Sequence, residues 1–255
     1  MSKIRQLFCV LILFASNAQA QLHTDSIQIA TKRAINYLNS LSEKDFPSYN
    51  QRLLLVYMHK KYKLVQAPRK NILSISNLLP EDSVVYCCYT PLIGKKVKVD
   101  EEGLLRIFTN SKGVGKLMLW GIHSGKLPLD SCLAEFNCIE GARDMMHAAL
   151  SLYWAGSNAS LSQQQIIQQL RVKYKAEFIA TMNLEKTITD TGMEAILGLL
   201  FLKERERVSY NWIKEILAAQ QANGGWSWTG EQDEKPHPHT TLLAVWILQL
   251  ILHQE

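Results

Sequence analysis

An apolar helical segment that recurs three times constrains the fold most strongly. The segments "RDMMHAALSLY", "DTGMEAILGLL" and "HTTLLAVWILQ" begin at Arg143, Asp190 and His239, so they are spaced 47 and 49 residues apart. A period in this range, carried by pairs of helices, indicates a repeat array. When the segments are aligned, each places an alanine at the same position, where a small side chain lets neighbouring inner helices approach closely: Ala148, Ala195 and Ala244.

Two kinds of helix alternate along the second half of the chain. Segments 188–202 and 239–252 are apolar on nearly every face, as is typical of helices enclosed by others. Segments 160–174 and 209–221 are amphipathic and have one polar face. The pattern predicts an all-α protein of inner and outer helices. Residues 70–108 are the exception, because "DSVVYCCYT" and "KKVKVDEE" are rich in β-forming residues. We expect an irregular or small β insertion there.

The loop "QQANGGWSW" joins the last outer helix to the last inner helix. Its glycines can take positive φ just past a helix end, its tryptophans can lie over that end, and its glutamines can bond freed backbone carbonyls. We therefore interpret the loop as structural, through Gln220, Gln221, Gly224, Gly225, Trp226 and Trp228.

This loop and the following "HTTLLAVWILQL" resemble the QW-type repeat of the alpha/alpha-toroid superfamily. That superfamily includes terpene cyclases, protein prenyltransferases and the thioester-containing domains of the alpha-2-macroglobulin and complement family. The resemblance is good over 185–255, weaker over 127–184 and only architectural before that. It implies an alpha/alpha-toroid-like fold of helical hairpins, and we expect an incomplete ring. An all-α bundle without a ring is the alternative.

The catalytic motifs of the superfamily are not intact in this chain. It has no DxDD acid and no DDxxD-like magnesium site, and "TGEQ" at 229–232 stands where a thioester domain has CGEQ. Asp130, Cys132 and His239 formally match the zinc ligands of prenyltransferases, but Cys132 has a neighbour competent for a disulfide. His237 and His239, near Asp233 and Glu234, can bind a metal weakly, although an exposed polar linker is the simpler interpretation. We expect neither a metal nor a cofactor.

Five residues form the candidate site. In the alignment of the inner helices, Arg143, Asp190 and His239 share the first position, and His147 and Glu194 share the position one turn further on. Residues i and i+4 stack on one helix face, so these side chains are expected at the mouth of a central cavity. A buried glutamate near a histidine can act as an acid–base pair. The structural alternative is helix capping by Asp190 and Asp144 and a satisfied ion pair for Glu194. Glu194 is expected either to face a wet cavity or to have a buried partner.

The first twenty residues have the layout of a secretory signal. Lys3 and Arg5 precede an apolar run over 7–15, and "AQA" at 18–20 provides a small-x-small cleavage site. The run is well short of the roughly 20 residues that a membrane span needs. The remaining chain, 21–255, is expected to form a single domain that is periplasmic or extracellular. Export permits disulfides, and four cysteines allow three pairings. Cys132 and Cys138 can close a short loop if their segment is not a continuous helix.

The charge of the chain does not indicate a nucleic-acid partner. Cleavage after residue 20 removes two basic residues and no acidic one, so the formal net charge falls from +5 to +3. We expect a protein that binds an unidentified protein partner or an apolar ligand on its concave inner-helix face. The alternative is a toroid-class enzyme, cyclase-like or glycan-acting, that uses acid–base residues at the inner-helix N-termini.

Export can be tested directly. The mature protein should lack residues 1–20, because all three regions of a secretory signal occur in order. Mass spectrometry of protein recovered from the secretory compartment measures this, and a mature chain that still starts at Met1 would refute the prediction.

Overall fold

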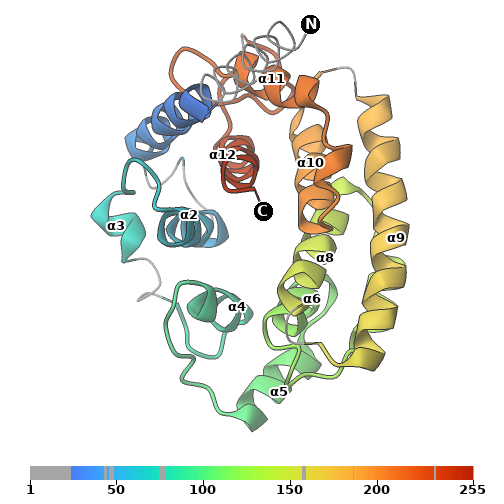
Figure 1. Ribbon diagram of the computed structural model, residues 1–255. Coiled ribbons are helices and arrows are strands. Elements are labelled where there is room, and N and C mark those ends of the chain that lie inside the picture. The colour runs from blue at the N-terminus through green and yellow to red at the C-terminus, as the bar shows by residue number, and fades with distance from the viewer. Residues whose placement is uncertain are drawn as a thin grey trace, which may run out of the picture.

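All regular secondary structure in the described part of the chain is helical. The computed structural model describes residues 24–42, 45, 49–74, 79–156, 159–185, 187–232 and 234–254, and every regular element in these ranges is a helix (Figure 1). The first helix covers 24–40. The others are α2 (Tyr49–Tyr62), α3 (Lys70–Leu73), α4 (Val84–Leu92), α5 (Glu101–Asn110), α6 (Gly113–Ile122), α7 (Asp130–Cys138), α8 (Ala142–Ala155), α9 (Leu161–Leu184), α10 (Asp190–Phe201), the 3-10 helix η2 (Arg205–Arg207), α11 (Tyr210–Ala218) and α12 (Pro238–Leu252). The expected signal at 1–20 and Asp233 lie outside the described residues.

The even-numbered helices contact one another in a closed series. Helix α2 contacts α4, and the contacts continue from α4 through α6, α8 and α10 to α12, which contacts α2 again. The odd-numbered helices attach to this series from outside: α3 to α2, α5 to α4 and α6, α7 to α6, and α9 to α8 and α10. Figure 1 shows the even-numbered helices around the centre, with α3, α5 and α9 at the periphery.

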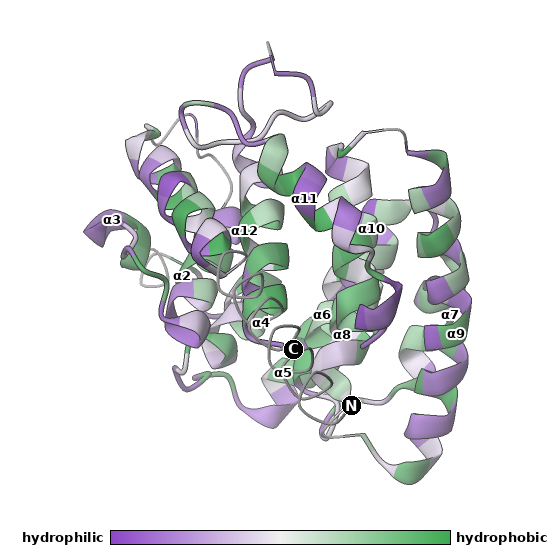
Figure 2. Ribbon diagram, turned by 45° about the horizontal axis from the view of Figure 1, so that its top comes forward, coloured by the Kyte–Doolittle hydropathy of each residue, from purple (hydrophilic) through white to green (hydrophobic). Residues whose placement is uncertain are grey.

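Burial separates inner from outer helices as the hydropathy pattern predicts. Every side chain of α10 except Thr191 is buried, and so is nearly every side chain of α12. Helix α9 buries only one stripe at helical spacing: Ile167, Leu170, Tyr174, Phe178 and Met182. In Figure 2, α12 is accordingly almost uniformly apolar, whereas α9 alternates between polar and apolar residues. Among the helices of the described residues, none combines the length and the apolar character needed to cross a membrane.

Small residues allow the closest approaches between helices. The aligned alanines Ala148, Ala195 and Ala244 are fully buried. A Cβ added to Gly121 of α6 would lie 2.6 Å from the backbone oxygen of Ser151 in α8. A Cβ added to Gly198 of α10 would lie 2.2 Å from the Phe178 ring of α9. Glycine is therefore required at both crossings, because any larger residue would overlap its neighbour.

The expectation of β structure within 70–108 is wrong for the described residues. Helices α3, α4 and α5 occupy most of this segment, and 93–100 contains neither helix nor strand. Helix α4 covers "VVYCCYTPL", the stretch that appeared most β-like, and Ser83 caps it by accepting a hydrogen bond from the Tyr86 amide. Its residues 86–90 are buried. Tertiary burial has outweighed the β propensity of valine and tyrosine here.

The possible bridge between Cys132 and Cys138 is not formed, because its condition, a break in the helix, is not met. Both residues belong to one continuous helix, α7, and both thiols are free. Six residues of α-helix separate two Cα atoms by about 9 Å, which exceeds the span of a disulfide. Cys132 is buried and Cys138 is exposed, so the two side chains lie on different faces. Cys87 and Cys88 are also free.

The Gly-Gly-Trp loop covers the end of α11. Trp226 is 1% exposed, and its indole N–H donates to the carbonyl of Ile216 over 2.7 Å, satisfying a carbonyl in the last turn of α11. The Trp226 amide donates to the hydroxyl of Thr241 in α12. Gly224 has φ +96°, and a Cβ there would lie 2.3 Å from the carbonyl oxygen of Arg33. The loop therefore joins α11, α12 and the first helix.

The side chains of Gln220 and Gln221 donate hydrogen bonds to carbonyls outside α11. Gln220 donates to Ala30 in the first helix and to Gly224 in the loop. Gln221 donates to the loop carbonyls of Glu231 and Glu234. Their role is structural, as the sequence indicates, but they hold the loop to itself and to the first helix.

The loss of Trp226 should destabilise the protein strongly. Trp226→Ala should lower the free energy of unfolding by about 3 kcal/mol or more, because it removes a large buried aromatic ring. Trp228→Ala in the same loop is the matched control, since Trp228 is 46% exposed and should cost much less. Chemical denaturation of both variants measures this, and equal losses would contradict the structural role of Trp226.

Candidate functional site

The first turns of the inner helices meet at one end of the closed series, which we call the mouth. A cavity of about 210 Å³ there is lined by Asn50 of α2, by residues of α4 and α6, and by Arg143, Asp144 and His147 of α8. Its walls are largely apolar and are formed by Val84, Val85, Cys88, Tyr89, Val114, Gly115 and Met118. The first turns of α10 and α12 meet beside it through Asp190 and Thr240.

Asp190 is the centre of a polar contact between α10 and α12. Its carboxylate is buried and accepts a 2.5 Å hydrogen bond from the hydroxyl of Thr240. The Nδ1 atom of His239 lies 3.0 Å from Oδ1 and 3.1 Å from Oδ2 of the same carboxylate. The backbone amide of Asp190 donates to the carbonyl of Trp228. Asp190 does not cap α10, because Thr189 does so by accepting from the Gly192 amide.

Trp228 and His237 complete this contact. The Trp228 ring lies edge-on to His237 at 4.8 Å and tilted to His239 at 6.1 Å between centroids. Burial lowers the pKa of His237, and the nearby Asp190 carboxylate opposes that shift. Its Nδ1 atom is buried and has no hydrogen-bond partner among the described residues. The ligand atoms of Asp190, His237 and His239 lie within 4.8 Å of one another.

His147 lines the cavity and is held by its own helix. Its Nδ1 atom lies 2.8 Å from the backbone oxygen of Arg143, one turn earlier. Burial lowers the pKa of His147; the hydrogen bond to the Arg143 carbonyl opposes this shift, and the Arg143 guanidinium adds to it. The imidazole is therefore neutral near pH 7 and carries a lone pair available to a ligand.

Glu194 is buried, and one of its two carboxylate oxygens has no partner. The residue is 3% exposed, and its Oε1 atom has no hydrogen-bond partner within the described ranges. Burial, together with the charge of Asp190, raises the pKa of Glu194 to about 8, although Arg143 opposes the shift. An unpaired buried carboxylate is costly, and protonation removes most of that cost. Glu194 is therefore a neutral acid at pH 7.

The structure brings the five candidate residues into one electrostatic neighbourhood and joins two pairs of them, His239 to the Asp190 carboxylate and His147 to the Arg143 backbone. Asp190 and His239 form a hydrogen bond, and the charge of Arg143 affects the pKa of both His147 and Glu194. No hydrogen bond between His147 and Glu194 is present among the described residues, so the expected acid–base pair is not in direct contact.

Sequence reasoning missed three members of the site. Asp144 lines the cavity, Thr240 bonds the Asp190 carboxylate, and Trp228 packs on the histidines rather than on the helix end. The sequence favours an exposed linker for His237 and His239. Both residues are instead partly buried, and Pro238 between them begins α12. The proline at the first helical position was the available signal, because it fixes both flanking residues at a helix start.

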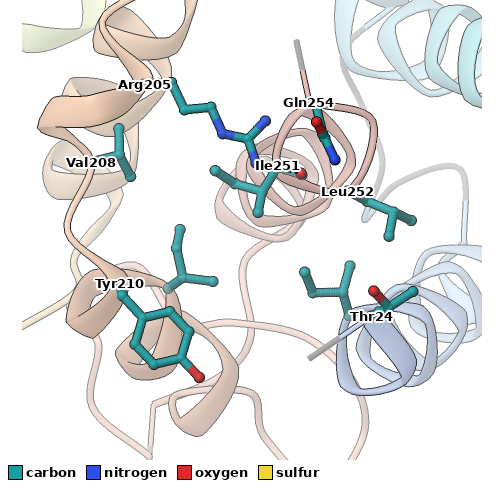
Figure 3. A pocket seen from close by; sticks show the side chains of 9 residues that line it. Thr24, Arg205, Val208, Tyr210, Ile251, Leu252 and Gln254 are labelled. Atoms are coloured by element: carbon teal, nitrogen blue, oxygen red, sulfur yellow. Dashed lines mark hydrogen bonds between the residues drawn. The ribbon is translucent and has the colours of Figure 1, made fainter. Parts of the chain in front are cut away.

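Larger hollows lie away from the centre of the mouth, among them one of about 420 Å³ lined by Tyr153, Trp154, Gly156 and Lys203. A second, of about 330 Å³, is lined by Tyr37, Gln51, Lys235, His237 and their neighbours. Another of about 360 Å³ lies between the first helix, α11 and the end of α12 (Figure 3). In the latter, Arg205 is directed toward the end of α12, where it donates to the carbonyl of Ile251. This bond caps a helix C-terminus, which is a structural role.

Comparison with models of known protein families, with curated proteins and with solved structures finds no match.

The buried acid predicts how stability depends on pH. The folded pKa of Glu194 is about 8 against an ordinary value of 4.5, so the folded state holds the proton more tightly. The stability that Glu194 contributes through this proton is fully present below about pH 4.5 and is lost as pH rises through 8. Since one pKa unit corresponds to about 1.4 kcal/mol, Glu194→Gln should gain up to roughly 4 kcal/mol over the wild type by pH 8 or above.

Urea unfolding of both proteins between pH 5 and pH 9 measures this difference. Glu177→Gln, at an exposed position on α9, is the matched control and should run parallel to the wild type. A constant difference between Glu194→Gln and the wild type across this range would show that Glu194 is ionised in the folded protein.

Proposed function

We propose that this chain is an exported alpha/alpha-toroid-like protein that binds an apolar ligand or partner at the mouth of its inner helices. The toroid interpretation is supported by the closed series of contacts among the even-numbered helices and by the outer position of the odd-numbered ones. It is also supported by the Gly-Gly-Trp loop, whose contacts join an outer helix end to the next inner helix. The proposed location, periplasmic or extracellular, rests on the N-terminal signal pattern.

The observation that carries the binding proposal is the cavity at the mouth. Four inner helices contribute their first turns to it, so its shape depends on how these helices pack rather than on one loop. Concave, mostly apolar cavities with a few polar groups are the usual form of small-molecule sites. Valine and methionine side chains offer an apolar wall, and Arg143, Asp144 and His147 provide polar groups at one side.

The arrangement supports binding more than catalysis. His147 is neutral near pH 7, and its Nδ1 atom faces a backbone carbonyl that can only accept, which leaves Nε2 to accept one hydrogen bond from a ligand. The arginine and the aspartate on the same turn can orient a polar end group. An apolar body with one polar end is therefore the ligand chemistry that fits best.

A filled cavity should abolish this binding. We use 1-anilinonaphthalene-8-sulfonate, an apolar fluorescent anion, as the probe. Val114→Trp places a large ring in the cavity and should weaken probe binding at least tenfold, which corresponds to about 1.4 kcal/mol. Val172→Trp, on the exposed face of α9, is the same chemical change elsewhere and should leave the affinity as it is.

Fluorescence titration gives the two affinities, and circular dichroism shows that both variants are folded. If Val114→Trp is folded and binds the probe as tightly as the wild type, the cavity is not the binding site.

A further inference from the structure

We propose that Asp190, His237 and His239 form a binding site for a first-row transition-metal dication such as Zn²⁺. The three side chains come from the first turn of α10, the residue before α12 and the first turn of α12. One ligand atom from each lies within 4.8 Å of the other two. Ligands of a tetrahedral zinc ion, at about 2.0–2.1 Å from the metal, are separated by about 3.3–3.4 Å. Small side-chain rotations therefore suffice to reach that geometry.

The donor set selects the class of metal. Two imidazole nitrogens and one carboxylate oxygen suit zinc, iron, cobalt or nickel, whereas calcium and magnesium prefer oxygen ligands alone. The Nδ1 atom of His239 lies 3.0 Å from Asp190 Oδ1, so a nitrogen ligand and an oxygen ligand already face each other.

His237 supplies the second, independent observation. Its Nδ1 atom is buried but has no hydrogen-bond partner in the described part of the chain. A buried polar atom without a partner costs stability unless something satisfies it. Its backbone is fixed on both sides, since its amide donates to Trp226 and its carbonyl accepts from Thr241. The imidazole is thus held beside the Asp190–His239 pair by contacts that do not involve its ring nitrogens.

The surroundings resemble the outer shell of a metal site. The Thr240 hydroxyl donates to Asp190 Oδ1, which orients the carboxylate as hydrogen bonds to ligating carboxylates do. The Trp228 ring covers both histidines and limits their rotation. Three protein ligands leave a tetrahedral ion one further position for water or a bound molecule. His237 also lines the hollow of about 330 Å³, which gives access from solvent.

Metal binding by the purified chain tests the proposal. Protein freed of metal with a chelator is titrated with Zn²⁺ against a chromogenic competitor, and with Co²⁺ while the visible absorption is recorded. We expect one equivalent of Zn²⁺, a tetrahedral Co²⁺ spectrum, and a rise in Tm with Zn²⁺ but not with Mg²⁺. His237→Ala and His239→Ala should each weaken Zn²⁺ binding at least tenfold and abolish the rise in Tm.

The control is His253→Ala, because His253 follows the opposite end of α12 and stacks on Tyr62. Its affinity for Zn²⁺ should equal that of the wild type. Thr240→Val should weaken binding roughly 10- to 100-fold, as the loss of outer-shell partners does. The His237 side chain makes no hydrogen bond among the described residues, so the His237→Ala variant should fold. Zn²⁺ binding that is absent, or that His237→Ala leaves unchanged, overturns the proposal whether or not the mouth binds the fluorescent probe.

Discussion

The fold depends on the connection between the first helix and the last loop. Arg33 donates to the carbonyls of Gln221 and Ala222, and Gln220 donates back to Ala30. These contacts bring residues almost 190 positions apart into hydrogen-bond distance. An open array of helical hairpins would leave one apolar face of α2 and one of α12 in water. Closure instead packs Tyr57 against Trp246 and buries both.

This closure explains why the loop between α11 and α12 is the most specific stretch of the chain. Several requirements meet there: an indole that covers a helix end, glycines that the first helix approaches closely, and glutamines that reach distant carbonyls. Each requirement excludes most other residue types at its position.

The sequence predicts helices well where local pattern and tertiary environment agree. The apolar faces of α10 and α12 and the single buried stripe of α9 follow directly from hydropathy. Prediction fails at α4, because valine, tyrosine and cysteine form either strands or buried helices, and only the neighbours α2 and α6 decide between them. The cysteines of α7 illustrate the same limit, since their separation depends on whether the segment is helical.

The site follows the same division. The alignment of the inner helices placed Asp190 and His239 at one repeat position, and the two side chains are in contact. The alignment predicts this contact because aligned positions fall in first turns that lie side by side. It does not predict the positions of Trp228 and His237, which depend on the path of a single loop. Nor does it show that the Oε1 atom of Glu194 lacks a partner among the described residues, since that depends on the elements packed around it.

Three of the eleven buried polar side-chain atoms that lack a partner among the described residues lie near the start of an inner helix, and the other eight are spread over the rest of the molecule. Glu194 Oε1 of α10, His237 Nδ1 before α12 and Gln51 Oε1 in the first turn of α2 are all buried without a partner among the described residues. Each of these atoms lowers the free energy of unfolding, and an apolar side chain of similar shape would not have this cost. Gln51 and His237 moreover line the same hollow. A group bound in that hollow from outside the chain would satisfy both atoms at once, whereas apolar side chains of similar shape would remove the cost without one.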